Sequence, residues 1–371
     1  MGIKITKQRG DTMLKKVEKI FTVTIIVLLV LIILVVAGFN IYQRILYREF
    51  FKTSEKEFKI PGLKDNYVPQ GLFYDKEKDI LFACGYMSDN TPSRIYYYVG
   101  KKDVDKHSKS VDTINFEYTQ LLTGDEKPDL CHAGGIAVYK DLVFLATGKE
   151  VSIYDINDIL NQKTATTIAT FDGHTDACFL HIEGDTLYVG EFYIAEAYET
   201  RQEHHMTTPS GEFHQALMTA FDLKEIESTV EQIQEEKELT NNTHISTIIP
   251  IAAYSITDNA QGMCILPNGE IAISISYALT NSHIKIYKKP IQSANTTKEY
   301  TLMVDNAENK IPLIFLDSST TKKDYLAQPM AEEIIYKDGK IFVMCESACN
   351  KYMFGNLTAS QYCYSFKPEI N

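Results

Sequence analysis

The stretch DNAQGM, residues 258–263, has a counterpart earlier in the chain in VPQGL, residues 68–72. Both Gln-Gly steps lead into a short turn, an alternating strand that ends in tyrosine, a polar loop and a Ser-basic-Ile-x-x-Tyr segment. A unit of short strands that recurs within one chain is typical of repeat architectures, and a unit of this size is typical of propeller blades. The sequence therefore predicts an all-β fold, a β-propeller.

Alternating apolar and polar residues, separated by turn-forming residues, divide the rest of the chain into five such units. The fifth unit lacks a fourth strand, and residues 56–60 (KEFKI) come directly before the first unit. We expect this N-terminal strand to complete the last blade and close the ring, which leaves no open sheet edge. Five blades are favoured. Six are the alternative, because residues 311–317 lie in a long segment that can supply further strands.

The expected strands are short and are joined by turns of hairpin type. By blade, they are residues 71–75, 80–86, 94–99 and 113–118; 135–139, 142–147, 151–156 and 166–171; 178–182, 186–192, 217–223 and 245–251; 262–266, 270–277, 283–288 and 299–304; and 333–336, 340–345 and 361–366. Two insertions lengthen the third blade. The first, 195–216, contains three histidines, and the second, 224–244, has the pattern of a charged helix.

Residues 21–39 (FTVTIIVLLVLIILVVAGF) are an apolar run of about the 20 residues that a helix needs to cross a bilayer. A cleaved secretory signal is the alternative, but its apolar region is usually roughly 7–15 residues long and no small-x-small site follows this run. Basic residues flank both ends, so the charge difference favours a cytoplasmic N-terminus only weakly. We predict a cytoplasmic basic tail (1–20), a transmembrane signal-anchor helix (21–39), a juxtamembrane stalk (40–55) and an extracytoplasmic propeller domain (56–371).

The net charge of −12 is unevenly distributed. Residues 1–59 carry eleven basic and five acidic side chains, a balance of +6, so residues 60–371 carry −18. A domain this acidic repels phosphate backbones, and we expect no nucleic-acid partner. The seven cysteines are an odd number without paired spacing, which argues against a disulfide framework. Cys345, Cys349 and Cys363 are left open as a bridge or a metal site.

In a propeller, the connections that lead into the innermost strands share one face with the connections between the second and third strands. Ligands usually meet that face, and here it gathers amides, imidazoles, carboxylates and tyrosines, which suit a polar ligand or a cation. The candidate ligand-binding residues are Gln70, Tyr86, His132, His174, Asp176, Tyr193, Asn259, Gln261, Tyr277 and Glu346. A structural role is the alternative for Gln70 and Gln261, since they occupy the same place in two blades and buried amides must find partners.

Glu332 differs from the residues at equivalent positions of the other blades, and it is the candidate catalytic residue. Together with Asn259 and Asp176 it forms the oxygen set that a calcium site at the axis would need. The His204-His205 and His214 insert is a looser metal candidate. No Gly-rich phosphate loop, serine nucleophile elbow or HExxH motif occurs in the sequence.

Short motifs of the later blades resemble a group of bacterial exported β-propeller proteins, near the strictosidine synthase-like and gluconolactonase-like propellers. The motifs are QGMCI (261–265), SISY (274–277), MAEEI (330–334) and FVMCES (342–347) followed by Lys351-Tyr352. The resemblance implies the fold and export. The gluconolactonase-like pattern has a Glu-Gly-Pro metal motif, where this chain has QGL (70–72) and EEI (332–334).

Two function classes remain open. The first is a membrane-anchored module, non-enzymatic, that binds a small polar ligand, a glycan, a peptide or a partner protein at the channel mouth. The second is a calcium-assisted hydrolase or lactonase that uses Glu332 as ligand or general base.

Overall fold

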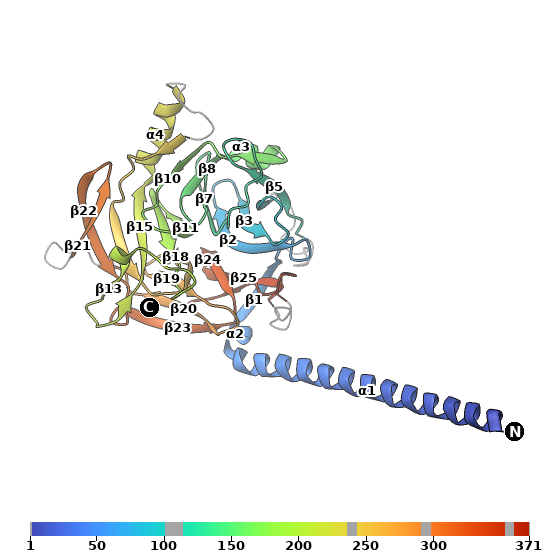
Figure 1. Cartoon of the computed structure of the whole chain (residues 1–371). Helices are drawn as coiled ribbons and strands as arrows, with labels where there is room; N and C mark the ends of the chain where they lie inside the picture. Colours follow the sequence, from blue (N-terminus) through green and yellow to red (C-terminus); the bar gives the residue numbers. More distant parts are fainter. Residues whose placement is uncertain (1, 101–113, 236–242, 291–297, 353–359, 371) are drawn as a thin grey trace. The chain divides into compact units, whose positions relative to one another are not determined.

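The structure, a computed structural model, describes residues 2–100, 114–235, 243–290, 298–352 and 360–370 (Figure 1). The chain forms two compact units, Met1–Arg48 and Glu49–Asn371. The first unit is a single helix, α1 (Gly2–Leu46). Within the described residues it is the one helix that is long and apolar enough to cross a membrane, from Lys15 to Leu46, and it contains the predicted span 21–39.

The second unit is a five-bladed β-propeller, as predicted. The innermost strands of successive blades are neighbours, and the innermost strand of the fifth blade again contacts that of the first. The blades, from the axis outward, are β2 (Tyr67–Asp75), β3 (Ile80–Met87), β4 (Arg94–Val99) and β5 (Glu117–Leu122); β6 (Gly135–Tyr139), β7 (Leu142–Ala146), β8 (Val151–Asp155) and β10 (Ala169–Phe171); β11 (Ala177–Glu183), β12 (Thr186–Glu191), β15 (Ala216–Asp222) and β17 (Ala252–Ile256); β18 (Ala260–Ile265), β19 (Ile271–Ile275), β20 (Ser282–Tyr287) and β23 (Thr321–Ala327); and β24 (Ala331–Lys337), β25 (Lys340–Cys345), β26 (Tyr362–Phe366) and β1 (Ser54–Lys59).

The N-terminal strand closes the ring. β1 runs antiparallel to β26, with Phe58 opposite Cys363, and so completes the fifth blade. Phe58 is buried, and its ring lies 5.5 Å from that of Phe116, counted between centroids. The helical turn before β1, α2 (Arg48–Thr53), adds Phe50, which contacts Phe366 of the same blade. The predicted closure is therefore confirmed, with the strand beginning two residues earlier than expected.

Two predicted outer strands are wrong. Residues 245–251 do not form the fourth strand of the third blade: Ile245 belongs to β16 (Thr243–Ile245), which pairs with β10 of the second blade. Residues 299–304 lie in β21 (Lys298–Val304), which forms a hairpin with β22 (Ala307–Phe315). This hairpin runs beside β17 and widens the third blade, so residues 311–317 do not begin a sixth blade. Alternation identified these segments as strands but carries no information about which neighbour they pair with.

The smaller outer elements depart from the prediction in the same way. The fourth strand of the first blade is β5, which overlaps the predicted 113–118 only at residues 117 and 118, and residue 113 lies outside the described part. Beyond β5, β9 (Thr164–Thr166) pairs parallel to it as the outermost strand of this sheet. The third blade carries the predicted charged helix, α4 (Leu223–Glu235). Of the rest of that prediction (224–244), residues 236–242 lie outside the described residues, and Thr243 and His244 belong to β16. The first insertion folds as a turn, η2 (Gln202–His204), and a small hairpin, β13 (Met206–Thr207) with β14 (Phe213–His214). A short helix, α3 (Ile156–Asn161), was not predicted.

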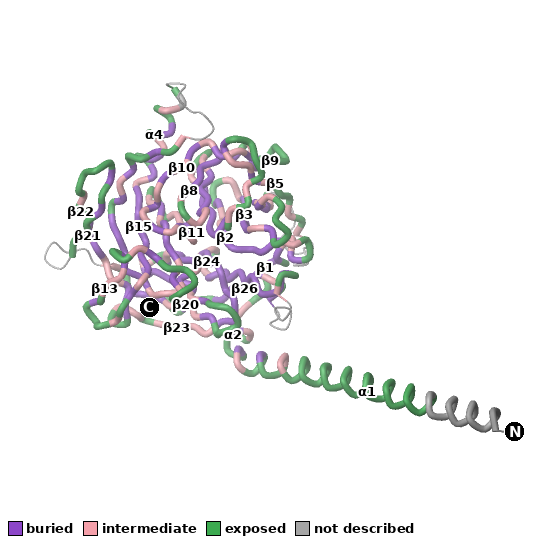
Figure 2. Tube along the Cα trace, viewed as in Figure 1, coloured by how far each residue is buried: buried purple, intermediate pink, exposed green. Residues whose placement is uncertain are grey.

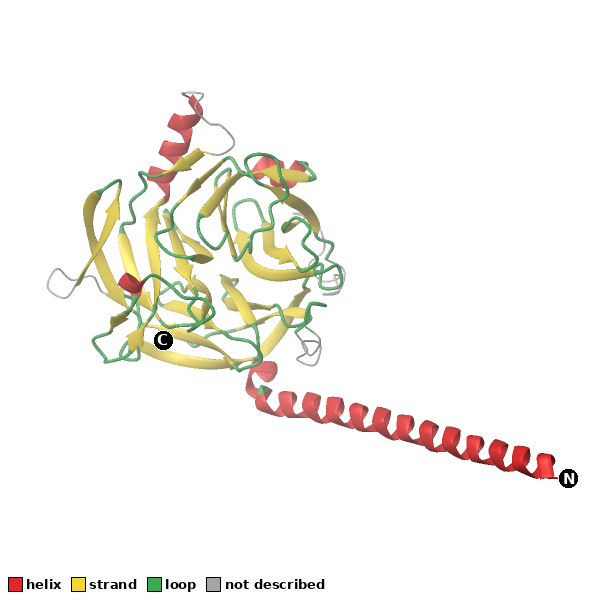
Figure 3. Ribbon diagram, in the orientation of Figure 1, coloured by secondary structure: helices red, strands yellow, loops and turns green. Residues whose placement is uncertain are grey.

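The core lies between neighbouring blades. Figure 2 shows the buried residues running along the strands, and Figure 3 shows α3 and α4 at the periphery of the sheets. Phe171 of the second blade meets Phe221 of the third edge to face, with centroids 5.5 Å apart. All seven cysteines are free thiols, so Cys345, Cys349 and Cys363 form no bridge in this structure. Burial raises the pKa of Cys345 to about 12, which makes its thiol unreactive.

Candidate functional site

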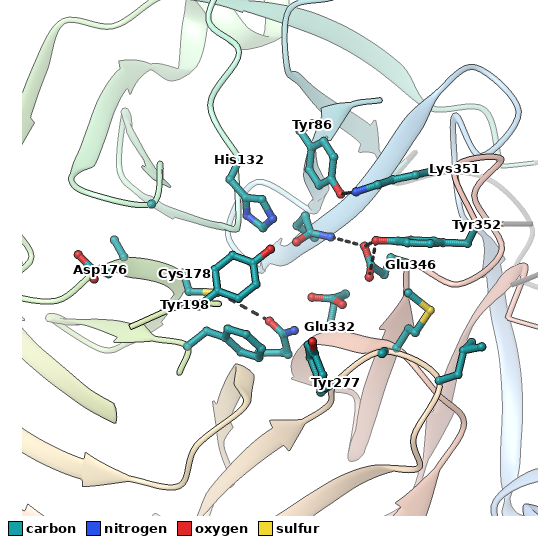
Figure 4. Close-up of a pocket in the computed structure, with 18 of the residues that line it drawn as sticks. Tyr86, His132, Asp176, Cys178, Tyr198, Tyr277, Glu332, Glu346, Lys351 and Tyr352 are labelled. Carbon is teal, nitrogen blue, oxygen red and sulfur yellow. Dashed lines mark hydrogen bonds between the residues drawn. The ribbon is translucent and has the colours of Figure 1, made fainter. Parts of the chain in front are cut away.

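A cavity of about 610 Å³ opens at the channel mouth, and side chains from all five blades line it (Figure 4). Its size is within the range of small-molecule sites, roughly 300–1,000 Å³. The residues that line it are Gln70, Tyr86, His132, Gly148, Asp176, Ala177, Cys178, Phe192, Tyr198, Glu199, Gln261, Tyr277, Ala278, Leu279, Met330, Glu332, Glu346, Lys351 and Tyr352.

Bulges in the innermost strands turn side chains toward this cavity. In β2, the pairing with β3 skips Gln70, and in β11 and β18 the pairing skips Cys178 and Gln261 in the same way. In β24, the irregularity covers Glu332 and Glu333. A bulge re-aims the extra side chain, and bulges are common beside active sites. The repeated position therefore supplies one cavity-lining side chain in four of the five blades.

The glycine after each Gln-Gly bulge is required by the close approach of neighbouring innermost strands. A Cβ on Gly71 would lie 2.8 Å from the Cα of Gly135, and one on Gly262 would lie 2.6 Å from the Cα of Glu333. Real Cβ atoms essentially never approach backbone this closely, so only glycine fits. In the Gln-Gly repeat, the glycine thus serves packing while the glutamine faces the cavity.

Glu332 is 3% exposed, and its carboxylate faces the cavity (Figure 4). Among the described residues it has no hydrogen-bond partner, and its pKa is raised well above the ordinary value. Burial is the main cause, and the nearby Glu346 and Glu333 add repulsion. The Glu332 carboxyl group is therefore available to a ligand in the cavity, and a ligand that donates hydrogen bonds can satisfy it.

Glu346 is the centre of a hydrogen-bond network that spans two blades. Its Oε2 accepts from Gln70 Nε2 at 2.9 Å, and the Tyr352 hydroxyl lies 3.0 Å from both carboxylate oxygens. Burial raises the pKa of Glu346 to about 7, although Tyr352, Lys351 and Gln70 all oppose the rise. This carboxylate is held by its neighbours, unlike that of Glu332.

Next to this network, the ammonium group of Lys351 contacts two tyrosine side chains. Lys351 Nζ donates to the Tyr86 hydroxyl and lies 4.7 Å from the centroid of the Tyr86 ring and 5.2 Å from that of Tyr352. The Tyr86 ring also stacks on the His132 ring, with centroids 5.0 Å apart. Burial and the charge of Lys351 lower the pKa of His132 to about 4, so this imidazole is neutral at pH 7.

The first insertion of the third blade brings Tyr198 and Glu199 to the cavity. It is attached by His204, whose Nδ1 lies 2.7 Å from Glu191 Oε1. Both side chains are almost completely inaccessible to solvent. Glu191 also accepts from the backbone amides of Leu217, at 2.8 Å, and Asp176, at 3.1 Å. The predicted metal tract therefore contains a residue that fixes the loop to the blade.

Eight of the residues singled out from the sequence come together at this cavity: Gln70, Tyr86, His132, Asp176, Gln261, Tyr277, Glu332 and Glu346. Three do not. Asn259 donates through its side-chain amide to the Tyr193 carbonyl at 2.7 Å, and neither of these two residues lines the cavity. His174 lies beside Asp172, whose carboxylate accepts from the backbone amide of His174 at 2.7 Å.

The calcium set proposed from the sequence is not assembled around the cavity, because Asn259 faces Tyr193 instead. Within the described residues, no group of three or more His, Cys, Asp or Glu side chains is arranged to hold a metal ion. Calcium binding and a catalytic role for Glu332 therefore stay predictions.

Several cavity residues were not predicted. Tyr198 and Glu199 lie in an insertion, and Lys351 and Tyr352 follow the end of β25 by six and seven residues, so no strand register could place them. Cys178 carried a usable signal, since it occupies the bulge position of the third blade, where the first and fourth blades have glutamine.

No protein-family model matches the sequence, and no curated protein is similar to it in sequence. Solved structures that align with this chain include a nidogen/laminin complex (7% identity, covering 76% of this chain and 73% of that chain, TM-score 0.36). The PQQ-bound aldose sugar dehydrogenase from Streptomyces coelicolor is 10% identical, with 84% of this chain and 95% of that chain covered and a TM-score of 0.37. BamB from Moraxella catarrhalis is 7% identical, with 82% and 84% covered and a TM-score of 0.32. These neighbours are β-propeller proteins, and similarities at this level assign no function to the chain.

Proposed function

We propose that the chain is a membrane-anchored, extracytoplasmic propeller that binds a small polar ligand at the channel mouth. The observation that carries the proposal is the cavity of about 610 Å³, to which every blade contributes and into which the bulged residues face. A cavity with an aromatic wall and a few convergent polar groups is the usual form of a ligand site. Glycans, short peptides and small metabolites are the ligand classes to be tested.

Aromatic side chains provide the contact surface for such a ligand. Phe192 and Tyr277 lie on one side of the cavity, with ring centroids 6.4 Å apart, and Tyr86 and Tyr352 lie on another side. Tyrosine offers an apolar face together with a hydroxyl, which suits both sugar rings and peptide groups.

The ligand-binding proposal is tested by thermal unfolding of the full chain in detergent, in the presence of libraries of glycans, short peptides and small polar metabolites. A ligand at about 100 times its Kd stabilises the protein by roughly 2.7 kcal/mol, which raises the melting temperature measurably. Tyr277→Ala should lose the shift, and Tyr118→Ala should keep it. The two tyrosines are similarly exposed, at 43% and 46%, but Tyr118 does not line this cavity. A shift that survives Tyr277→Ala, or the absence of any shift across the libraries, would contradict the proposal.

The membrane topology has its own test. In support of anchoring, α1 has an apolar window without buried residues, and basic residues precede it. Alkaline phosphatase fused after residue 371 should be active, because it needs the oxidising exterior for its disulfides. An inactive fusion together with a fluorescent cytoplasmic reporter fusion would place the propeller inside the cell.

A further inference from the structure

We infer that the cavity ligand is a small organic cation with N–H donors, of the primary ammonium type, held between the Glu332 carboxylate and the aromatic wall. The inference rests on the proposed ligand-binding function and names the chemical class of the ligand. Three features of the cavity support it: its acidic lining, the unpaired carboxyl group of Glu332, and an ammonium group that the protein already places there.

The first feature is the balance of charged side chains. Four acidic side chains line the cavity, those of Asp176, Glu199, Glu332 and Glu346, against the single ammonium of Lys351. Burial raises the pKa of Glu332 and Glu346, and a cation bound beside them favours their ionised form, so binding releases a proton. That ammonium is already used, since it donates to the Tyr86 hydroxyl. An anionic ligand would enter a low-dielectric site lined by carboxylates, where repulsion is weakly screened, whereas a cation is attracted there.

The second feature is the state of the two buried acids. The oxygens of Glu346 receive hydrogen bonds from Gln70 and Tyr352. Glu332, 3% exposed and facing the same space, receives none from the described residues. An ammonium group carries three N–H donors and a charge, and a charge-assisted hydrogen bond is roughly twice as strong as a neutral one. Glu332 is therefore the position where an incoming cation gains most.

The third feature is the aromatic wall, which already binds an ammonium group. Lys351 Nζ donates to the Tyr86 hydroxyl and lies 4.7 Å from the centroid of the Tyr86 ring and 5.2 Å from that of Tyr352. These distances are within the range of cation–aromatic attraction. Tyr277 and Phe192 form a second aromatic pair on the cavity wall, and no lysine or arginine contacts either ring in the described residues. This second pair is free to receive the cation of a ligand.

The test is isothermal titration of the full chain in detergent with 1,4-diaminobutane, and with 1,4-butanediol as the uncharged probe of the same length. We expect the diamine to bind with a Kd of about 1 mM or tighter, while the diol shows no binding up to about ten times that concentration. Equal binding of the two probes, or no binding of the diamine at about 10 mM, would overturn the inference.

Matched variants test whether the diamine binds at Glu332. Glu332→Gln keeps the shape of the side chain and should weaken diamine binding about tenfold or more, since a charged hydrogen bond is lost. Glu308→Gln removes the same charge from an exposed position of β22 and should leave the Kd unchanged. Lys351→Met removes the competing internal cation and should tighten binding. Similar effects of Glu332→Gln and Glu308→Gln would show a diffuse charge effect and overturn the inference.

Failure of this inference can be told apart from failure of the proposed function. If a neutral glycan binds, is lost in Tyr277→Ala, and the diamine does not bind, the ligand is uncharged and the binding function stands. If neither the libraries nor the diamine bind, both proposals fail.

Discussion

The side-chain amide of Gln70 donates to the Glu346 carboxylate across 2.9 Å and so joins the innermost strand of the first blade to the end of β25 in the fifth. The two residues are 276 positions apart in the sequence. The contact lies where the ring closes, on the cavity side, and it is one of three interactions that hold Glu346 in place. The Glu346 side chain therefore contributes both to the contact between the first and fifth blades and to the wall of the cavity.

The raised pKa of Glu346 predicts a pH-dependent stability. In the folded protein its pKa is about 7, above the ordinary value of 4.5, so the unfolded state holds its proton less tightly. The stabilisation that protonated Glu346 contributes to the folded state is fully present below about pH 4.5 and is lost as the pH rises toward about 7. Relative to Glu346→Gln, the wild type should lose on the order of 1–3 kcal/mol of unfolding free energy across this window. Urea unfolding at several pH values measures the difference between the two proteins.

Glu332 and Glu333 act in the same direction, because burial raises both pKa values. The effect of Glu333 is present in both proteins and cancels in the comparison. Glu346→Gln removes one of the charges that raise the pKa of Glu332, so the contribution of Glu332 is smaller in the variant and adds to the expected difference in the same direction. Parallel stability curves for wild type and Glu346→Gln would contradict the prediction.

Ring closure by β1 predicts a large effect of a single core substitution. Phe58→Ala removes a side chain that is 2% exposed and packs on Phe116, and it should cost about 3–5 kcal/mol. Phe213→Ala serves as the control, because Phe213 is 56% exposed, and it should change stability by about 0.5 kcal/mol or less. Chemical unfolding of both variants gives the comparison. A cost at Phe58 no larger than that at Phe213 would mean that β1 does not hold the fifth blade together.

The inner part of the fold follows from the sequence because each innermost hairpin is local. The repeated Gln-Gly step before an alternating strand identified β2 and β18 as innermost strands. Turn residues on either side of β25 predicted its bounds, and the structure has the same bounds. The outer edges do not follow, since β16 and β22 pair parallel with strands of other segments. Parallel pairing over long separations leaves no local signature in the sequence.

The cavity residues could be predicted from the sequence where they lie on innermost strands, but not where they lie on loops. Residues at the start of an innermost strand, such as Gln261, are placed by the repeat itself. Asn259 has a positive φ of 61°, and this conformation directs its amide to Tyr193 rather than to the axis. Lys351 and Tyr198 arrive from loops, whose course depends on packing that no periodicity encodes.

The close approach of β18 and β24 predicts that Gly262 tolerates no side chain. In Gly262→Ala, the Cβ would lie 2.6 Å from the Cα of Glu333 and would also displace its carboxylate, which accepts from Met263 N at 2.9 Å. We expect a loss of about 3 kcal/mol or more, from overpacking and from the broken hydrogen bond. Gly339→Ala is the control: Gly339 has a φ of 80° with open space around it, so only backbone strain of about 1 kcal/mol applies. If the two variants melt at the same temperature, the close approach of β18 and β24 does not restrict the side chain at position 262.

The Glu191–His204 pair predicts a coupling between loop anchoring and the cavity. His204→Ala leaves Glu191, which is completely buried, without its side-chain partner, and should cost about 2–4 kcal/mol. His244→Ala breaks an exposed pair with Glu150, 43% and 42% accessible, and should cost about 1 kcal/mol or less.

The loop that His204 holds also carries Tyr198 and Glu199 of the cavity. Hydrogen exchange of residues 194–205 should therefore rise in His204→Ala and stay unchanged in His244→Ala. The double variant Glu191→Gln/His204→Ala removes the buried charge and should recover part of the stability but not the slow exchange, since the contact that holds the loop is still absent. Exchange that is as slow in His204→Ala as in the wild type would show that the loop is held by other contacts.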